Sequence, residues 1–207
     1  MRVPLEESFH YCRKLAQRTG RNFYYSFLTL PRPLLRDMCA LYAFMRVTDD
    51  LGDDTSRSTG ARREALRAWR RSLQDALNDV EIAHPVLPAM VDVQRRHGIP
   101  VDHLEAVITG VEMDLDPQGF ETFEDLAFYC DHVAGAVGLC CIHIWGFCDP
   151  AAGERALDCG RAFQLTNILR DLGEDALMGR VYLPREDLLR FGYTADDLRR
   201  GRRDEKF

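Results

Sequence analysis

Four aspartates lie within six residues of one another, directly after an apolar segment of the sequence. They are Asp49, Asp50, Asp53 and Asp54. Residues four apart share a face of a helix, so Asp49 would lie beside Asp53. Two like charges about 6 Å apart repel by roughly 3 kcal/mol at an effective dielectric constant near 20. A helix has no structural reason to accept this repulsion, whereas an oxygen-seeking cation removes it, so the pattern indicates a metal site.

A second polar group lies on an otherwise apolar segment nearer the carboxyl end. It consists of Gln164, Asn167, Asp171 and Asp175, at steps of three, four and four residues. This spacing places all of them on one face of a helix. Either group alone is equally well explained as a solvated acidic face. Together they suit a site in which Mg²⁺ joins one or two carboxylates to the phosphates of a substrate.

The net charge limits the kind of partner. The chain has 27 Lys and Arg against 33 Asp and Glu, a formal net charge of −6. We expect no nucleic-acid partner, because proteins that bind nucleic acid normally carry a basic surface. An anionic substrate would need bound cations, which Mg²⁺ together with Arg46 and Arg170 would supply. Zinc would require His or Cys at ligand spacing, which the sequence does not contain.

The cysteines and the apolar segments bear on the cellular compartment. Seven cysteines without a Cys-x-x-Cys pair favour reduced core thiols in a cytoplasmic protein over disulfides or zinc. Residues 1–7 contain no apolar run, so we expect no signal peptide. The most apolar stretch, 133–147, is too short to span a bilayer. Peripheral membrane contact remains open.

Apolar residues recur with helical periodicity along almost the whole chain. Prolines at 31, 33, 85, 88 and 100 mark helix starts. No alternating run of β-branched residues is long enough for a sheet. We therefore expect an all-α single domain over residues 1–207. The predicted helices lie near 5–19, 33–54, 60–79, 84–97, 100–115, 122–130, 132–147, 151–176 and 184–190.

Several segments, in this order, carry a resemblance to a known family. They are Asn22-Phe23-Tyr24-Tyr25, Leu41-Tyr42-Ala43-Phe44-Met45-Arg46-Val47-Thr48-Asp49-Asp50, Glu112-Met113-Asp114-Leu115-Asp116, Tyr129-Cys130 with residues 133–138, Gln164 through Asp175, and Gly179-Arg180-Val181-Tyr182-Leu183-Pro184. From about residue 10 to its last residue the chain resembles a bacterial member of the squalene/phytoene synthase family, the head-to-head prenyl synthases.

The resemblance implies an isoprenoid synthase-type helical bundle with a central cavity, Mg²⁺ as cofactor and prenyl diphosphates as substrates. Asp49 and Asp53 would bind metal on one side, and Asp171 and Asp175, with Asn167, on the other. Tyr129 would lie over the reacting centre. Residues implied to bind substrate are Asn22, Phe23, Arg46, Gln164, Asn167, Arg170, Arg180 and Tyr182.

The implied chemistry is the loss of diphosphate from one prenyl donor, assisted by Mg²⁺. The resulting allylic cation alkylates the 2,3-double bond of a second prenyl diphosphate and gives a cyclopropylcarbinyl diphosphate. The protein would stabilise the leaving group and exclude water from the cation.

Two substrates fit the resemblance. Glu112-Met113-Asp114-Leu115 is slightly more similar to bacterial presqualene diphosphate synthases, which favours two farnesyl diphosphates giving presqualene diphosphate or squalene for a sterol or hopanoid route. The alternative is phytoene from two geranylgeranyl diphosphates. NADPH would be needed only for reduction to squalene, and the sequence shows no Gly-rich dinucleotide fingerprint.

A third interpretation comes from another class of protein. Chains of this family usually continue through several more helices, so a chain that ends at residue 207 would be C-terminally short. It could then be an inactive relative that acts as a binding or assembly factor. Such relatives tend to lose the aspartates, and this chain retains Asp49, Asp53, Asp171 and Asp175.

Aromatic and small residues surround the motifs. For each aromatic, core packing is the simpler explanation than an apolar tunnel. Residues 133–138, Val-Ala-Gly-Ala-Val-Gly, predict close packing between two helices. The alternative is a kinked helix that leaves room for a long isoprenoid.

Overall fold

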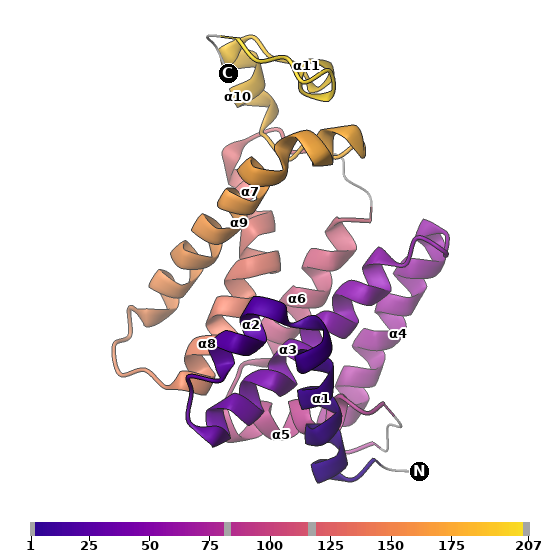
Figure 1. Ribbon diagram of the computed structural model, residues 1–207, viewed down its shortest axis with the longest axis vertical. Coiled ribbons are helices and arrows are strands. Elements are labelled where there is room, and N and C mark those ends of the chain that lie inside the picture. The colour runs from indigo at the N-terminus through magenta and orange to yellow at the C-terminus, as the bar shows by residue number, and fades with distance from the viewer. Residues whose placement is uncertain (1–2, 81–83, 116–118, 205–207) are drawn as a thin grey trace.

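The computed structural model describes residues 3–80, 84–115 and 119–204, and these residues form helices joined by short connections. In chain order the helices are α1 (Leu5–Thr19), α2 (Arg21–Phe27), α3 (Arg32–Asp53), α4 (Thr59–Leu77), α5 (Leu87–His97), α6 (Val101–Met113), α7 (Phe123–Cys130), the π-helical turn η1 (Asp131–Gly135), α8 (Ala136–Trp145), α9 (Ala152–Leu177), α10 (Arg185–Phe191) and α11 (Ala195–Arg199). Figure 1 shows α10 and α11 at the end of the molecule opposite the N-terminus.

Helix α3 lies at the centre of the main core. It packs against α1, α4, α5, α6 and α8, and it begins with Pro33 in its first turn, where the missing N–H costs no hydrogen bond. Phe44 is fully buried and stacks on Trp69 of α4 with ring centroids 5.5 Å apart. Burying a side chain of this size stabilises the fold by about 1.5–3 kcal/mol. Helix α3 is therefore a rigid support for the aspartates at its C-terminal end.

A buried hydrogen bond fixes that end of α3. Trp69 Nε1 donates to Thr48 Oγ1 at 2.9 Å, and the Thr48 hydroxyl donates to the Phe44 carbonyl at 2.9 Å. Thr48 is fully buried, so breaking this bond would leave a buried polar group unsatisfied. The residue that follows, Asp49, is held in place by this contact.

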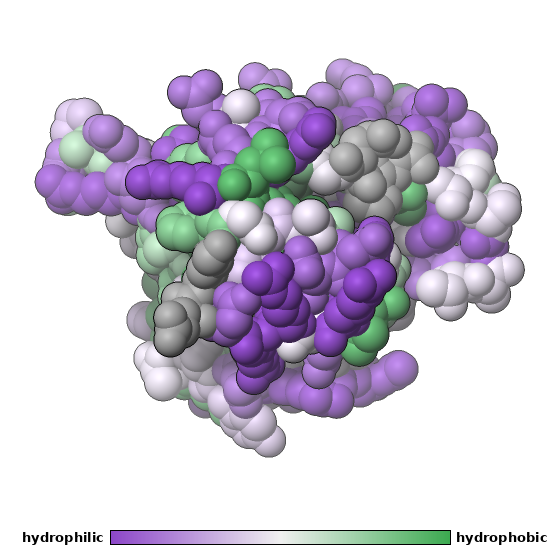
Figure 2. Space-filling view, turned by 90° about the horizontal axis from the view of Figure 1, so that it is seen from above, coloured by the Kyte–Doolittle hydropathy of each residue, from purple (hydrophilic) through white to green (hydrophobic). Residues whose placement is uncertain are grey.

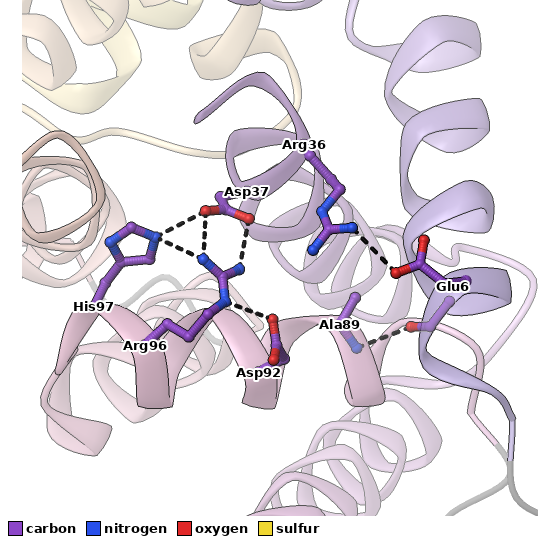
Figure 3. A network of polar contacts seen from close by, with 8 residues as sticks. Glu6, Arg36, Asp37, Ala89, Asp92, Arg96 and His97 are labelled. Atoms are coloured by element: carbon purple, nitrogen blue, oxygen red, sulfur yellow. Dashed lines mark hydrogen bonds and ion pairs between the residues drawn. The ribbon is translucent and has the colours of Figure 1, made fainter. Parts of the chain in front are cut away.

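The other end of α3 carries a buried charge that is fully compensated. Asp37 is 1% exposed and accepts from Arg96 at 2.7 and 2.9 Å and contacts His97 Nε2 at 2.8 Å. Arg96 also donates to Asp92 at 2.7 Å. Figure 3 shows Arg96 and His97 of α5 turned toward Asp37. Burial would raise the pKa of Asp37, but the hydrogen bonds from Arg96 and His97 outweigh it and hold the pKa below its usual range.

The segment from Phe123 to Trp145 is one continuous helical run that contains the π-helical turn η1. It packs against α6 and α9. A Cβ added at Gly160 of α9 would lie 2.7 Å from Gly135 Cα, so the two backbones approach too closely for any side chain. Arg161 of α9 also donates two hydrogen bonds to Asp131, at 2.6 and 2.8 Å. The predicted close packing at residues 133–138 is confirmed.

The all-α prediction is also confirmed, with three differences. Helix α2 and helix α11 were not predicted, and the predicted helices 122–130 and 132–147 are joined. The expectation that this apolar region is too short to span a bilayer is wrong, because the joined helix of 23 residues is long and apolar enough by composition. That is weak evidence for a membrane span, since a core helix of a bundle meets the same criterion.

Candidate active site

The first aspartate group occupies the last turns of α3. Asp50 pairs with Arg46 one turn earlier, with an N–O distance of 2.6 Å. Asp49 reaches solvent, but the surrounding protein displaces much of the water near it. This desolvation, followed by the charge of Asp53, raises the pKa of Asp49 to about 7. The protein thus holds the carboxylates of Asp49 and Asp53 close together without enough positive charge nearby to neutralise both.

The second group lies on α9. Arg170 donates to both oxygens of Asp171, at 2.7 and 2.6 Å, which holds the pKa of Asp171 below its ordinary value. Partial burial and the charge of Asp171 raise the pKa of Asp175. Gln164 and Asn167 are half-buried on the same helix. The predicted stripe therefore exists as a feature of one helix.

Arg180 links the two groups. It follows α9 in the chain and interacts electrostatically with Asp53 of the first group and with Asp175 of the second. The spacing in the sequence did not indicate this position, because it depends on the turn after α9. An anion bound between the two groups would meet Arg180.

Asp114, at the C-terminal end of α6, connects two of the predicted site residues. Its Oδ1 accepts a hydrogen bond from Tyr129 at 2.8 Å and another from Tyr182 at 3.2 Å. The two tyrosine rings are stacked, with centroids 5.5 Å apart. Burial and then the charge of Asp114 raise the pKa of Tyr182 to about 12. Asp114 belongs to a segment that carries the family resemblance, but its pattern implied no role for this residue, and Asp116 of the same segment lies outside the described residues.

Backbone hydrogen bonds hold the segment that carries Arg180 and Tyr182. Arg185 N donates to the Phe120 carbonyl at 2.8 Å, and Glu186 N donates to the Glu121 carbonyl at 3.1 Å. The Phe120 ring lies 5.3 Å from Tyr129 and 6.3 Å from Tyr182. The chain after α9 is thereby attached to the segment that precedes α7, and the Phe120 ring packs against both tyrosine rings.

Helix α2 places Phe23 beside the face of α3 that carries Asp49. Phe23 lies 6.4 Å from the ring of Tyr42. Tyr42 precedes Arg46 by one turn and Asp49 by two, so all three share a face of the helix. Asn22 and Phe23 are exposed, and their predicted contact with substrate stays a prediction.

The donor atoms suit Mg²⁺. The two groups offer carboxylate and amide oxygens, which are the ligands that a hard cation prefers, and none of the His or Cys ligands typical of zinc. The crowding of Asp49 and Asp53 is what a bound cation would relieve. Among the described residues, no group of three or more His, Cys, Asp or Glu converges on one point. Mg²⁺ held by one or two carboxylates takes its other ligands from water and phosphate.

A hollow at the opposite end of the molecule is not part of this site. It has a volume of about 520 Å³, lies between α1, α4 and α5, and contains none of the predicted site residues in its lining. Seen from above, the surface is largely hydrophilic with apolar patches between (Figure 2). The predicted central cavity remains a prediction.

Known proteins resemble this chain in sequence and in fold. The family model described as squalene/phytoene synthase matches residues 16–207. A phytoene synthase of Arthrospira platensis is 34% identical over 225 residues, which cover 100% of this chain and 71% of the relative. A presqualene diphosphate synthase of Zymomonas mobilis is 42% identical over 177 residues, 84% of this chain and 60% of the relative.

A solved structure agrees with these matches. The squalene synthase HpnC from Alicyclobacillus acidocaldarius superposes with a TM-score of 0.89 at 32% identity and covers 99% of this chain, which spans 77% of that protein. The chain thus spans roughly 60–77% of the length of these three proteins. On the family match, the identities and the shared fold, the chain belongs to the squalene/phytoene synthase family.

Proposed function

We propose that this protein condenses two prenyl diphosphates head to head in a reaction that depends on Mg²⁺. The observation that carries the proposal is the pair of aspartate groups on α3 and α9, with Arg180 in electrostatic contact with both. The relatives described above are named phytoene synthase and presqualene diphosphate synthase, which supports the same reaction class.

Each part of the site has a distinct task in this reaction. Asp49, Asp53, Asp171 and Asp175 would hold Mg²⁺, with Asn167 beside the second pair. When bound, Mg²⁺ supplies positive charge that stabilises the departing diphosphate.

The remaining residues act directly on the substrate. Arg180, with Arg46 and Arg170, would bind diphosphate oxygens, and these arginines need no protonation step because they are always charged. The Tyr182 ring, with Tyr129 and Phe120 stacked against it, would help to shield the allylic cation from water.

For the substrate we propose farnesyl diphosphate, with presqualene diphosphate as the first product. The 42% identity to a presqualene diphosphate synthase exceeds the 34% identity to a phytoene synthase, although the second match covers more of the chain. Geranylgeranyl diphosphate, giving phytoene, is the alternative. An inactive assembly factor is not favoured, because both aspartate pairs and Arg180 are present.

The test is incubation with farnesyl or geranylgeranyl diphosphate and Mg²⁺, with and without NADPH, followed by product analysis. We expect a C30 cyclopropylcarbinyl diphosphate from farnesyl diphosphate, and squalene only if NADPH is used. Asp75→Asn, an exposed carboxylate on α4, serves as a control that should leave turnover unchanged. Diphosphate release only from geranylgeranyl diphosphate would contradict the substrate assignment. No release from either donor by a folded sample would contradict the reaction.

A further inference from the structure

The C-terminal end of α3 is held from outside by a side chain of α4. Arg62, in the first turn of α4, donates from Nη1 to the Gly52 carbonyl at 2.8 Å, and its Nη2 donates to Thr59 Oγ1 at 3.3 Å. Gly52 is buried and lies between Asp50 and Asp53 in the chain. The guanidinium is therefore attached to the backbone of the turn that carries the first aspartate group.

The Gly52 carbonyl is an acceptor that the helix itself cannot satisfy. The last four C=O groups of an α-helix have no N–H partner within the helix, and α3 ends at Asp53. Partial negative charge accumulates at a helix C-terminus, where a charged donor forms a stronger hydrogen bond than a neutral one. The last turn of α3 contains no basic residue. Arg62 of the neighbouring helix supplies that charged donor.

Gly52 is also the point at which α6 packs against this turn. A Cβ added at Gly52 would overlap Val111 Cγ1 of α6, so any side chain at this position would push the two helices apart. The backbone of the turn is thus enclosed by Arg62 of α4 and Val111 of α6. The side chains of Asp49 and Asp53, in contrast, are exposed. The protein holds the backbone of the turn and leaves its carboxylates accessible.

The turn needs such an anchor because its own charges oppose it. Asp49 and Asp53 are one helical turn apart, and like charges at this spacing destabilise a helix. Unwinding the last turn would relieve the repulsion, and helix ends fray readily. Desolvation and then the charge of Asp53 raise the pKa of Asp49, and the charge that lowers it most is that of Arg46. Arg62 therefore acts chiefly on the backbone, and the carboxylates keep the charge that attracts a cation.

One atom of Arg62 indicates that stability alone does not explain this contact. Its Nε is buried and has no hydrogen-bond partner among the described residues. A buried donor without a partner destabilises the fold, and so does the partial removal of a charged group from water. A neutral side chain would avoid both costs but would lose the charged donor to Gly52. The contact thus favours a fixed turn over the highest stability.

We propose that Arg62 is a positioning residue for the Mg²⁺ site, an inference that rests on the proposed function. By binding the Gly52 carbonyl, it keeps Asp49 and Asp53 one helical turn apart in the absence of the cation. Cation binding then requires no ordering of the turn, so the site is half-saturated at a lower Mg²⁺ concentration. Arg62 acts through the backbone of α3 and not through contact with the substrate.

The experiment compares Arg62→Gln with the wild type in the full chain. Titration with inorganic diphosphate at a series of fixed Mg²⁺ concentrations gives the Mg²⁺ concentration for half-maximal binding. We expect this concentration to rise about tenfold, the effect of losing one hydrogen bond from a charged donor. Amide hydrogen exchange at residues 50–54 should become faster in EDTA and slow again when Mg²⁺ and diphosphate are added. Turnover should need more Mg²⁺ by the same factor, and saturating Mg²⁺ should restore it to within about three-fold of the wild type.

Two further variants separate positioning from folding. Arg62→Lys keeps the charge but replaces the fork that reaches both Gly52 and Thr59 with a single ammonium group. Its shift in Mg²⁺ concentration should have the same direction and be smaller, and it provides the same measurements if Arg62→Gln does not fold. Arg67→Gln is the matched control, because Arg67 is an exposed arginine of the same helix that lies 4.0 Å from Glu64. It should match the wild type in diphosphate binding and in amide exchange.

The contrary outcomes are distinct. An unchanged Mg²⁺ requirement in both Arg62 variants overturns the inference, and so does a lower turnover with an unchanged dependence on Mg²⁺. Faster exchange throughout α3 and α4, instead of at residues 50–54, assigns Arg62 a general structural role and also overturns it. A wild-type chain that binds diphosphate with Mg²⁺ but releases none from either prenyl donor overturns the proposed function. The binding and exchange measurements on Arg62→Gln would still decide this inference in that case.

Discussion

Helix α3 carries two aspartates, Asp37 and Asp49, whose electrostatic environments are opposite. Asp37 and Asp49 are twelve residues apart, about 18 Å along the helix axis. Asp37 is buried against Arg96 and His97, and its pKa is lowered. Asp49 is shielded from water by the surrounding protein and lies near other carboxylates, and these two causes raise its pKa to about 7. The protein neutralises the first charge itself and leaves the second to be neutralised by something it binds.

The largest difference between the Asp49 end and the Asp37 end of α3 should appear in the effect of substitutions on turnover. Asp49→Asn and Asp171→Asn should each reduce diphosphate release by about 10²-fold or more, since each removes a charge that acts on the departing group. Release from farnesyl diphosphate in saturating Mg²⁺ measures this. Without Mg²⁺, Asp49→Asn should not unfold at a lower temperature than the wild type, because it removes repulsion from Asp53. A variant within a few-fold of the wild-type rate would contradict the two-group site.

Stabilisation of the protein by bound Mg²⁺ and diphosphate should depend on Asp49 and not on Asp37. Mg²⁺ with inorganic diphosphate should raise the melting temperature of the wild type, because a ligand at 100 times its dissociation constant stabilises by about 2.7 kcal/mol. Thermal unfolding with and without EDTA measures the shift. The shift should be retained in Asp37→Asn and reduced in Asp49→Asn. Equal shifts in both variants would show that the ions bind elsewhere.

The Asp37 network near the start of α3 should contribute to the free energy of unfolding and not to turnover. Asp37→Asn removes the charge that Arg96 and His97 face, and we expect a loss of about 2 kcal/mol in the free energy of unfolding. Because Arg96 is partly exposed and keeps Asp92, the loss should stay below that of a fully buried pair. Urea unfolding measures it, and turnover per folded molecule should remain within two-fold of the wild type. Unchanged stability would mean that the network contributes nothing.

The smallest effect concerns pH. A carboxylate whose pKa is lower in the folded than in the unfolded protein stabilises the fold above its unfolded pKa, about 3.9 for Asp. That contribution is lost as the pH falls through the folded pKa. The stability difference between wild type and Asp37→Asn should therefore be constant from neutral pH down to about 5 and shrink below it. Urea midpoints at several pH values test this, and a difference that grows in acid would contradict the lowered pKa of Asp37.

Periodicity was sufficient to predict most of the helices and the two aspartate groups. The spacing of Asp49 and Asp53 and of Asp171 and Asp175 depends only on the helical repeat, which is local. The position of Arg180 between the groups depends on the turn after α9 and on hydrogen bonds to residues 120 and 121, which are not local. The hydrogen bonds that Asp114 accepts from Tyr129 and Tyr182 could not be predicted either, because a single Asp at a helix end forms no recognisable sequence pattern.

The elements that sequence analysis missed also have physical reasons. Helix α2 has seven residues, too few for the apolar period to be recognised. The polar pair Asp131 and His132 interrupts the apolar pattern between α7 and α8, so one continuous helix was predicted as two. The π-helical turn itself leaves no signature in the sequence, because it differs from an α-helical turn in its hydrogen-bond spacing.

The π-helical turn has a consequence for how this protein tolerates insertions and deletions. A π turn contains one residue more than the α-helical turn it replaces, and each residue of an α-helix rotates the chain by about 100°. Deleting one residue within Asp131–Gly135 would let the whole run become a regular helix with every backbone bond formed. It would also rotate α7 relative to α8 and carry the Tyr129 hydroxyl away from Asp114. A single codon lost at this point would keep the helix continuous and break the hydrogen bond between Tyr129 and Asp114.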